Sequence, residues 1–219
     1  MSNKIQACEE KFVNKSCILP PGLSHAELLN AMEHSANIIT SINANLTSEG
    51  LPMLTELIQA NNFSGVVSNV FTKSLDICTP YKDNHDQRYP DLINETNNVG
   101  LEIKAAKSPS KGAESHNGHS GWHLIASYEM VEGTLVFTCL KFADLIGFEN
   151  GEVDWKYQGS QRNSNNSQRT ETYITTPQGR AKLLAGIAYL NTDLVPTWRR
   201  WRYPSGYKMP AWSVWNTLP

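Results

Sequence analysis

A strictly alternating stretch at residues 99–105 constrains the fold of this chain most strongly. Successive side chains of a β-strand point to opposite faces of the sheet. The odd-numbered residues of this stretch are all apolar and would share one buried face. Glu102 and Lys104 would lie together on the other face, about 6.6 Å apart at a rise of about 3.3 Å per residue. The stretch therefore predicts a strand with one core face and one charged face.

Helical patterns precede this strand. Residues 24–46 carry apolar side chains at helical spacing, and Ser24 with Glu27 three residues later forms the pattern of a capping box. Residues 52–61 and 64–76 predict two further helices, although the valines in the last stretch are less favourable to a helix.

The rest of the chain reads mainly as strands and loops. Residues 81–89 are polar and predict a solvent-facing loop. Thr176-Pro177 predicts the start of a helix that continues to about Leu190. Strands are predicted where short apolar or alternating runs lie between turn residues, at 90–93, 122–130, 134–142, 152–157 and 170–175. This order of elements predicts an α/β fold.

The composition is that of one globular domain. The chain has 219 residues, of which 40% are hydrophobic and 18% charged. We divide it into a helical part at 24–76, a core at 77–145 and a polar, basic part at 151–219. Residues 151–210 contain nine Lys/Arg and four Asp/Glu, a net charge of +5 against −7 for the remainder. This asymmetry is compatible with binding a polyanion.

Several classes of protein are not indicated. The four cysteines are isolated, so neither a zinc ribbon nor a disulfide framework is predicted. Secretory-signal, membrane-span, P-loop, dinucleotide-binding and nucleophile-elbow patterns are absent from the sequence. We therefore expect a cytoplasmic protein without a membrane partner.

The chemistry-bearing residues lie around the alternating strand. A turn at residues 94–98 would return the chain so that Asp91 approaches Glu102. Their carboxylates, with the Ile103 carbonyl, would supply the oxygen ligands that Mg²⁺ prefers. Lys104 would orient an attacking water and stabilise a charged transition state.

Pro90-Asp91, followed after ten residues by Glu102-Ile103-Lys104, resembles the PD-(D/E)XK nuclease superfamily. The resemblance covers residues 90–104, or 52–142 if the order of elements is included. It implies a mixed four-stranded sheet flanked by helices, a restriction-endonuclease-like core, and cleavage that depends on Mg²⁺ or Mn²⁺. Many members carry another acid on the preceding helix, where this chain has none; Glu56 is the candidate substitute, ahead of Glu49.

Three stretches carry candidate DNA contacts. Arg, Asn and Gln at 161–169 could read base edges, although a loop without a partner has the same composition. At 198–203 we assign the arginines to DNA and the tryptophans to packing. Residues 107–111 directly follow the active strand. The candidates are Lys107, Ser108, Lys111, Arg162, Asn163, Asn165, Asn166, Gln168, Arg169, Arg199, Arg200 and Arg202.

His116, His119 and His123 only weakly suggest zinc, because glycines interrupt the spacing and a fourth ligand is not evident. A loop histidine near the active site is the favoured interpretation.

The sequence thus favours a Mg²⁺-dependent endonuclease that cuts double-stranded DNA at a specific short sequence, like a type II restriction enzyme. A palindromic target would favour a homodimer. Two alternatives remain open: a structure-selective, repair or phage nuclease, and a non-catalytic DNA-binding protein in which Glu102 and Lys104 form only a surface pair.

Overall fold

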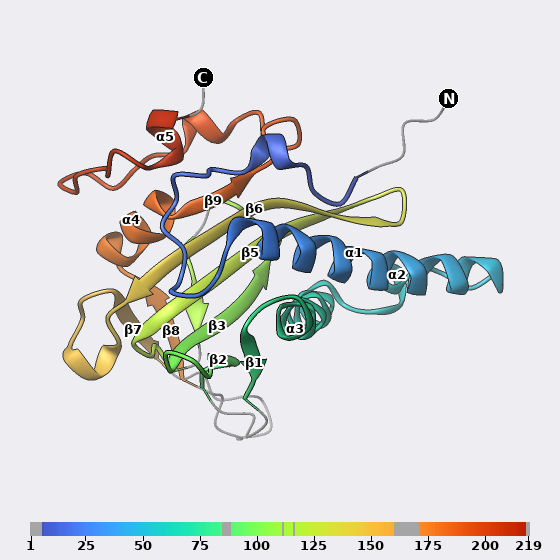
Figure 1. Cartoon of the computed structure of the whole chain (residues 1–219), viewed down its shortest axis with the longest axis horizontal. Helices are drawn as coiled ribbons and strands as arrows, with labels where there is room; N and C mark the ends of the chain where they lie inside the picture. The colour runs from blue at the N-terminus through green and yellow to red at the C-terminus, as the bar shows by residue number, and fades with distance from the viewer. Residues whose placement is uncertain (1–5, 85–88, 111, 116, 160–170, 218–219) are drawn as a thin grey trace.

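The computed structural model of the chain describes residues 6–84, 89–110, 112–115, 117–159 and 171–217. In this part of the chain, a six-stranded sheet runs through the centre with helices on both faces (Figure 1). One neighbouring pair, β3 and β5, is parallel and the others are antiparallel, so the sheet is mixed. In spatial order the strands are β1 (Tyr81–Asp83), β2 (Leu92–Asn94), β3 (Val99–Ala106), β5 (Gly121–Val131), β6 (Thr134–Leu145) and β9 (Ile187–Leu190). The predicted α/β fold is confirmed, with six strands where the family resemblance implies four.

The first helix begins where the sequence predicts. α1 (His25–Ser48) has Ser24 as its N-cap. The Ser24 hydroxyl accepts a hydrogen bond from the Glu27 N–H at 3.2 Å, and the Glu27 carboxylate accepts one from the Ser24 N–H at 2.8 Å. This reciprocal pair satisfies two N–H groups that have no partner within the helix, and it confirms the predicted capping box.

The second and third helices differ from the prediction. α2 (Leu54–Leu57) is a single turn, because Ile58 is extended, with φ −119° and ψ 138°. α3 (Ala60–Cys78) therefore begins inside the stretch that was predicted as the second helix. Phe63 lies one turn before Val67 and is equally buried, so the apolar stripe of α3 starts earlier than the predicted boundary.

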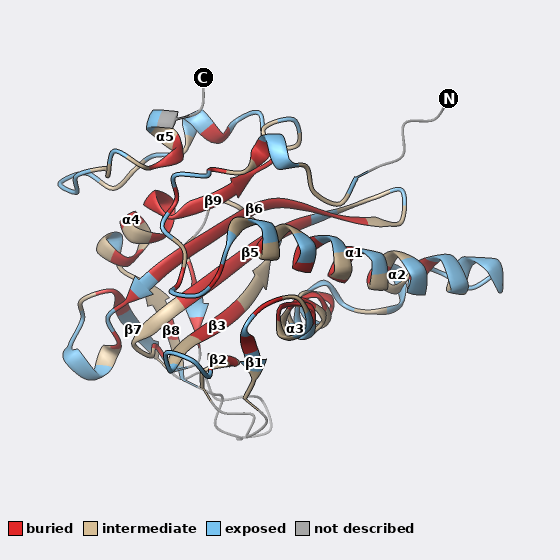
Figure 2. Ribbon diagram, in the orientation of Figure 1, coloured by how far each residue is buried: buried red, intermediate tan, exposed pale blue. Residues whose placement is uncertain are grey.

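α1 and α3 cover one face of the central sheet, and the larger hydrophobic core lies between them and the strands. Leu101 and Ile103 of β3 point into this core and are fully buried, as the alternation predicts. Val99 and Ala105 are partly buried and pack against the same cluster. Figure 2 shows buried residues along β5 and β6 and on the inner sides of the helices.

A smaller antiparallel sheet and one helix cover part of the opposite face. In spatial order its strands are β4 (Glu114–Ser115), β8 (Thr172–Thr175) and β7 (Trp155–Gly159). Together with α4 (Pro177–Ala185) they enclose a second core that includes Ile125, Trp155 and Leu183. The charged side of β3 therefore lies on the face of the central sheet that bears this second layer.

Two predictions about element type are wrong. The loop predicted at 81–89 contains β1, which pairs with β2. The helix predicted to reach Leu190 ends at Ala185, and β9 follows. The four residues of β9 are all buried, so their sequence lacks the alternation that distinguishes a half-buried strand from a helix. Gly186 lies between the two elements, where a Cβ would lie 1.8 Å from the Phe142 carbonyl oxygen, so a larger residue would not fit this close approach.

The last part of the chain packs beyond β9. Trp198 and Trp215 lie with ring centroids 5.1 Å apart in a third apolar cluster with Ile187. The predicted packing role of the tryptophans at 198–203 is confirmed, because Trp198 is buried in this cluster and Trp201 packs against it. The remaining short elements are η1 (Glu10–Phe12), η2 (Phe148–Asn150), η3 (Trp198–Arg200) and α5 (Val214–Thr217). No helix in the described residues has the length and apolar character needed to cross a membrane.

Candidate active site

The pairing of β2 with β3 brings Asp91 to Glu102. Leu92 lies opposite Leu101 in this antiparallel pair, and the next register position places Asp91 opposite Glu102. The chain reverses at residues 94–98, where Asn98 has a φ of 56°. Asparagine tolerates this left-handed conformation better than most residues. The predicted return of the chain is therefore confirmed.

Gly100 lets the chain before Asp91 lie flat against β3. A Cβ at Gly100 would lie 2.5 Å from Cγ of Pro90, which is too close for a rigid proline ring to tolerate. The absence of a side chain at Gly100 thus permits Pro90 to pack there. The residue after that proline is Asp91, so this contact helps to set the position of its carboxylate.

The Asp91 carboxylate is held by the β3 backbone. Its Oδ2 accepts a hydrogen bond of 2.7 Å from the Ile103 N–H. Burial and the neighbouring Glu102 nevertheless raise the pKa of Asp91 from 3.8 to about 6, against the opposing effects of this hydrogen bond and of Lys104. Two carboxylates that repel each other in a partly buried place form a site that a cation would stabilise.

Lys104 and the Ile103 carbonyl complete this group. The Lys104 ammonium forms an ion pair with the Glu102 carboxylate, and its side chain is 36% exposed against 10% for that of Glu102. The Ile103 carbonyl accepts a hydrogen bond of 3.1 Å from the hydroxyl of Ser68 on α3. A carbonyl oxygen has two lone pairs, so this bond still leaves one for another partner.

His123 lies next to this group, within the strand predicted at 122–130. It lies within β5, in register with Glu102, and is not on a loop. Its Nδ1 lies 2.8 Å from the Gly121 carbonyl oxygen, and its buried Nε2 has no hydrogen-bond partner among the described residues. Burial lowers the pKa of His123 to about 4, so the ring is neutral near pH 7.

The other two histidines of the weak zinc pattern give no support for a metal site. His119 stacks on Tyr89 with ring centroids 4.4 Å apart, and His116 lies outside the described residues. In the part of the chain that the structure describes, no group of three or more His, Cys, Asp or Glu side chains is arranged to hold a metal ion. Any metal site here would therefore combine Asp91 and Glu102 with backbone oxygen and solvent.

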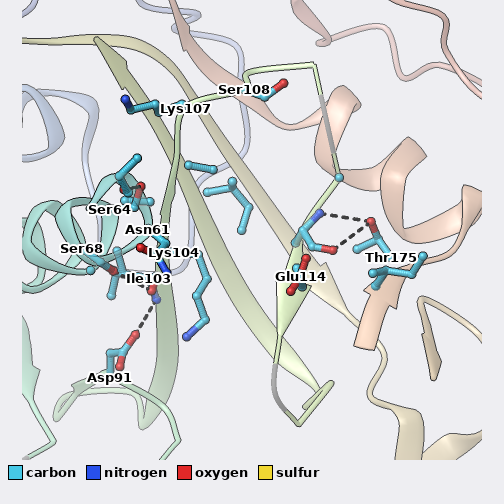
Figure 3. A pocket seen from close by; sticks show the side chains of 18 of the residues that line it. Asn61, Ser64, Ser68, Asp91, Ile103, Lys104, Lys107, Ser108, Glu114 and Thr175 are labelled. Carbon is cyan, nitrogen blue, oxygen red and sulfur yellow. Dashed lines mark hydrogen bonds between the residues drawn. The ribbon is translucent and has the colours of Figure 1, made fainter. Parts of the chain in front are cut away.

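A groove of about 1080 Å³ runs past these residues between α3 and the smaller sheet (Figure 3). Asp91, Ile103 and Lys104 line it on one side of the strand. The α3 wall is polar and uncharged, with Asn61, Ser64, Ser68, Asn69 and Thr72. The opposite wall includes Ser110, Glu114, Thr175 and Arg180. The groove thus draws on residues outside the predicted core at 77–145.

The predicted DNA contacts fall into three groups. Lys107 and Ser108 line the groove. Lys111 and all candidates at 161–169 (Arg162, Asn163, Asn165, Asn166, Gln168 and Arg169) lie outside the described residues. Arg199, Arg200 and Arg202 are exposed, but they follow β9, at the edge of the sheet opposite to β1 and β2 (Figure 1). The structure does not bring these three arginines to the groove.

Glu56, the candidate additional acid, is exposed on α2 and does not line the groove. The α3 residues that face the groove are uncharged, so this wall supplies no substitute acid among the residues that line it.

Comparison of the chain with models of known protein families, with curated proteins and with solved structures finds no match.

Proposed function

We propose that this protein is a Mg²⁺-dependent nuclease that hydrolyses phosphodiester bonds of double-stranded DNA, with Asp91, Glu102 and Lys104 in its active site. The observation that carries the proposal is the convergence of these three side chains, from β3 and the residue before β2, beside the groove. A polyanionic substrate needs positive charge at the point where charge develops, and paired carboxylates are the usual protein ligands for a hard cation.

The chain's own groups fit a magnesium ion. The Ile103 N–H binds one oxygen of Asp91 and leaves the other available. Glu102 supplies a second carboxylate, and the Ile103 carbonyl retains a free lone pair. When bound there, the ion would polarise a phosphoryl oxygen of the substrate. The same oxygen donors would accept Mn²⁺.

Lys104 has the second role. In this structure its ammonium donates to Glu102, which holds it on the groove side of β3. An ammonium has three donors, so Lys104 can contact Glu102 and still offer hydrogen bonds to an attacking water or a phosphoryl oxygen. It would thereby orient the nucleophile and stabilise the charge that develops in the transition state.

We further propose that cleavage occurs at a specific short sequence and that the enzyme acts as a homodimer in the cytoplasm. The support for specificity is the Arg, Asn and Gln content of residues 161–169, whose side-chain types bind guanine and adenine edges. A nuclease that selects flaps, junctions or single strands would use the same carboxylate site.

The test is incubation of the purified protein with long duplex, branched and single-stranded DNA, each in Mg²⁺, Mn²⁺ or EDTA. Discrete duplex fragments that require the cation, and that are lost in Glu102→Gln, are the expected result. Cleavage of branched or single-stranded DNA in preference to duplex would instead select the structure-selective nuclease. Binding of duplex without cleavage in any condition would contradict the enzyme proposal and favour the DNA-binding protein.

A further inference from the structure

A buried lysine that has no role in the proposed reaction contacts the groove wall opposite α3. Lys141 lies in the middle of β6 and is fully buried. Ile125 of β5 pairs with Lys104 of β3 on one side and with Lys141 on the other. Lys141 therefore lies on the same sheet face as Lys104, two strands or roughly 10 Å away. Its ammonium donates a hydrogen bond of 3.1 Å to the Pro109 carbonyl. This contact holds the start of the groove loop that follows β3.

Arg180 of α4 contacts the next residue of that loop. Its Nη2 donates to the Ser110 carbonyl at 3.4 Å, and its side chain lines the groove. Burial lowers the pKa of Lys141, and Arg180 lies close enough for its charge to lower that pKa further. Two basic side chains from different elements are therefore grouped beneath one wall of the groove.

The guanidinium of Arg180 is incompletely satisfied. Its Nε is buried and has no hydrogen-bond partner among the described residues. No carboxylate in the described part of the chain forms an ion pair with Arg180, although Glu114 lines the same wall and is exposed. A buried cationic donor without an acceptor is costly, and an anion bound beside the same guanidinium would offset part of this cost. The planar fork of a guanidinium matches the oxygens of a phosphate.

We propose that Arg180 binds a backbone phosphate of the substrate at a second point in the groove, separate from the Asp91–Glu102 site. Lys141 is a positioning residue that fixes the loop against which this phosphate lies. This inference rests on the proposed function and deepens it, because it assigns the substrate as a nucleic-acid strand long enough to contact both points.

The salt dependence of DNA binding tests this assignment. Fluorescence anisotropy with a short fluorescein-labelled duplex, in EDTA to prevent cleavage, gives the slope of log affinity against log salt concentration. Each phosphate contact by a cation contributes about −0.9 to this slope for duplex DNA. We expect Arg180→Gln to make the slope shallower by about 0.9. Arg180→Lys should keep the slope of the wild type, because it retains the charge.

Lys15→Gln is the matched control, since it removes one exposed lysine that pairs with Glu10 and does not line the groove. Thermal melts establish that each variant is folded. An unchanged slope in a folded Arg180→Gln, with a wild type that binds and cleaves DNA, would overturn the Arg180 assignment and leave the nuclease proposal intact. A wild type that binds no DNA would overturn the nuclease proposal and, with it, this inference.

Discussion

Asp91 lies in a partly buried position beside Glu102, where its negative charge is unfavourable without a bound cation. Burial and Glu102 raise the pKa of its carboxyl from 3.8 to about 6, so the folded chain binds this proton more tightly than the unfolded chain. The associated stability is fully present below about pH 4 and is lost as the pH rises through about 6. At neutral pH without metal, the carboxylate pair should therefore destabilise the fold. A residue retained at such a cost is typical of a binding or catalytic site.

Replacing Asp91 by asparagine should stabilise the metal-free protein. The amide keeps an oxygen for the Ile103 N–H and removes the repulsion with Glu102. We expect the free energy of unfolding at neutral pH to rise by about 1–3 kcal/mol, since one pKa unit corresponds to about 1.4 kcal/mol. Urea unfolding in EDTA measures this. Asp193→Asn, at an exposed ion pair with Lys11, should change little. A less stable Asp91→Asn would contradict this account of the site.

Cation binding should also depend on pH. A protonated carboxyl is a poor ligand, so the rise in melting temperature caused by Mg²⁺ should fade as the pH falls through about 6. Thermal melts in Mg²⁺ and in EDTA across this range provide the measurement. Asp91→Asn should show no Mg²⁺-dependent rise at any pH. An equal Mg²⁺ effect in the variant would show that the ion binds elsewhere.

At the scale of elements, local patterns predict the structure well and long-range contacts do not. The capping box places the start of α1, and alternation places β3, because both signals lie in neighbouring residues. β9 was predicted as helix, since burial on both faces removes its alternation and only pairing with β6 makes it a strand. The end of α4 likewise depends on the close approach of Gly186 to Phe142.

The contact between the Pro90 segment and β3 offers a test at this scale. Gly100→Ala would place a methyl group 2.5 Å from Cγ of Pro90, so the segment before β2 must move. We expect a loss of about 1–3 kcal/mol in unfolding free energy, as for other overpacked sites. The displacement of Asp91 should also weaken Mg²⁺ binding, measured by calorimetry.

Gly65→Ala is the control for the steric effect, because a Cβ there has no neighbour within 4 Å. Since Gly65 lies within α3, this change should leave the unfolding free energy unchanged or raise it by up to about 1 kcal/mol. If Gly100→Ala bound Mg²⁺ as tightly as the wild type, the close packing of Pro90 would have no role in positioning Asp91.

At the scale of the whole molecule, the sequence predicts the centre of the site but not its surroundings. Asp91 and Glu102 meet through a short connection, so their approach follows from one turn and one register. His123 lies on β5 and Arg180 on α4, so their positions beside the site depend on how elements distant in the sequence pack together. The fold also separates the basic residues of 151–210, since Arg180 lines the groove and the arginines after β9 do not.

In the proposed mechanism, Lys104 and the carboxylate pair act together to cleave DNA. The most direct measurement is the single-turnover rate of duplex cleavage in Mg²⁺ for wild type, Lys104→Met and Lys15→Met. We predict that Lys104→Met lowers the rate by about 10²–10³-fold, the usual effect of removing one donor to a developing charge. Lys15→Met, at an exposed lysine that pairs with Glu10, should cleave at the wild-type rate. Equal rates for a folded Lys104→Met and the wild type, or no cleavage by the wild type, would contradict the account.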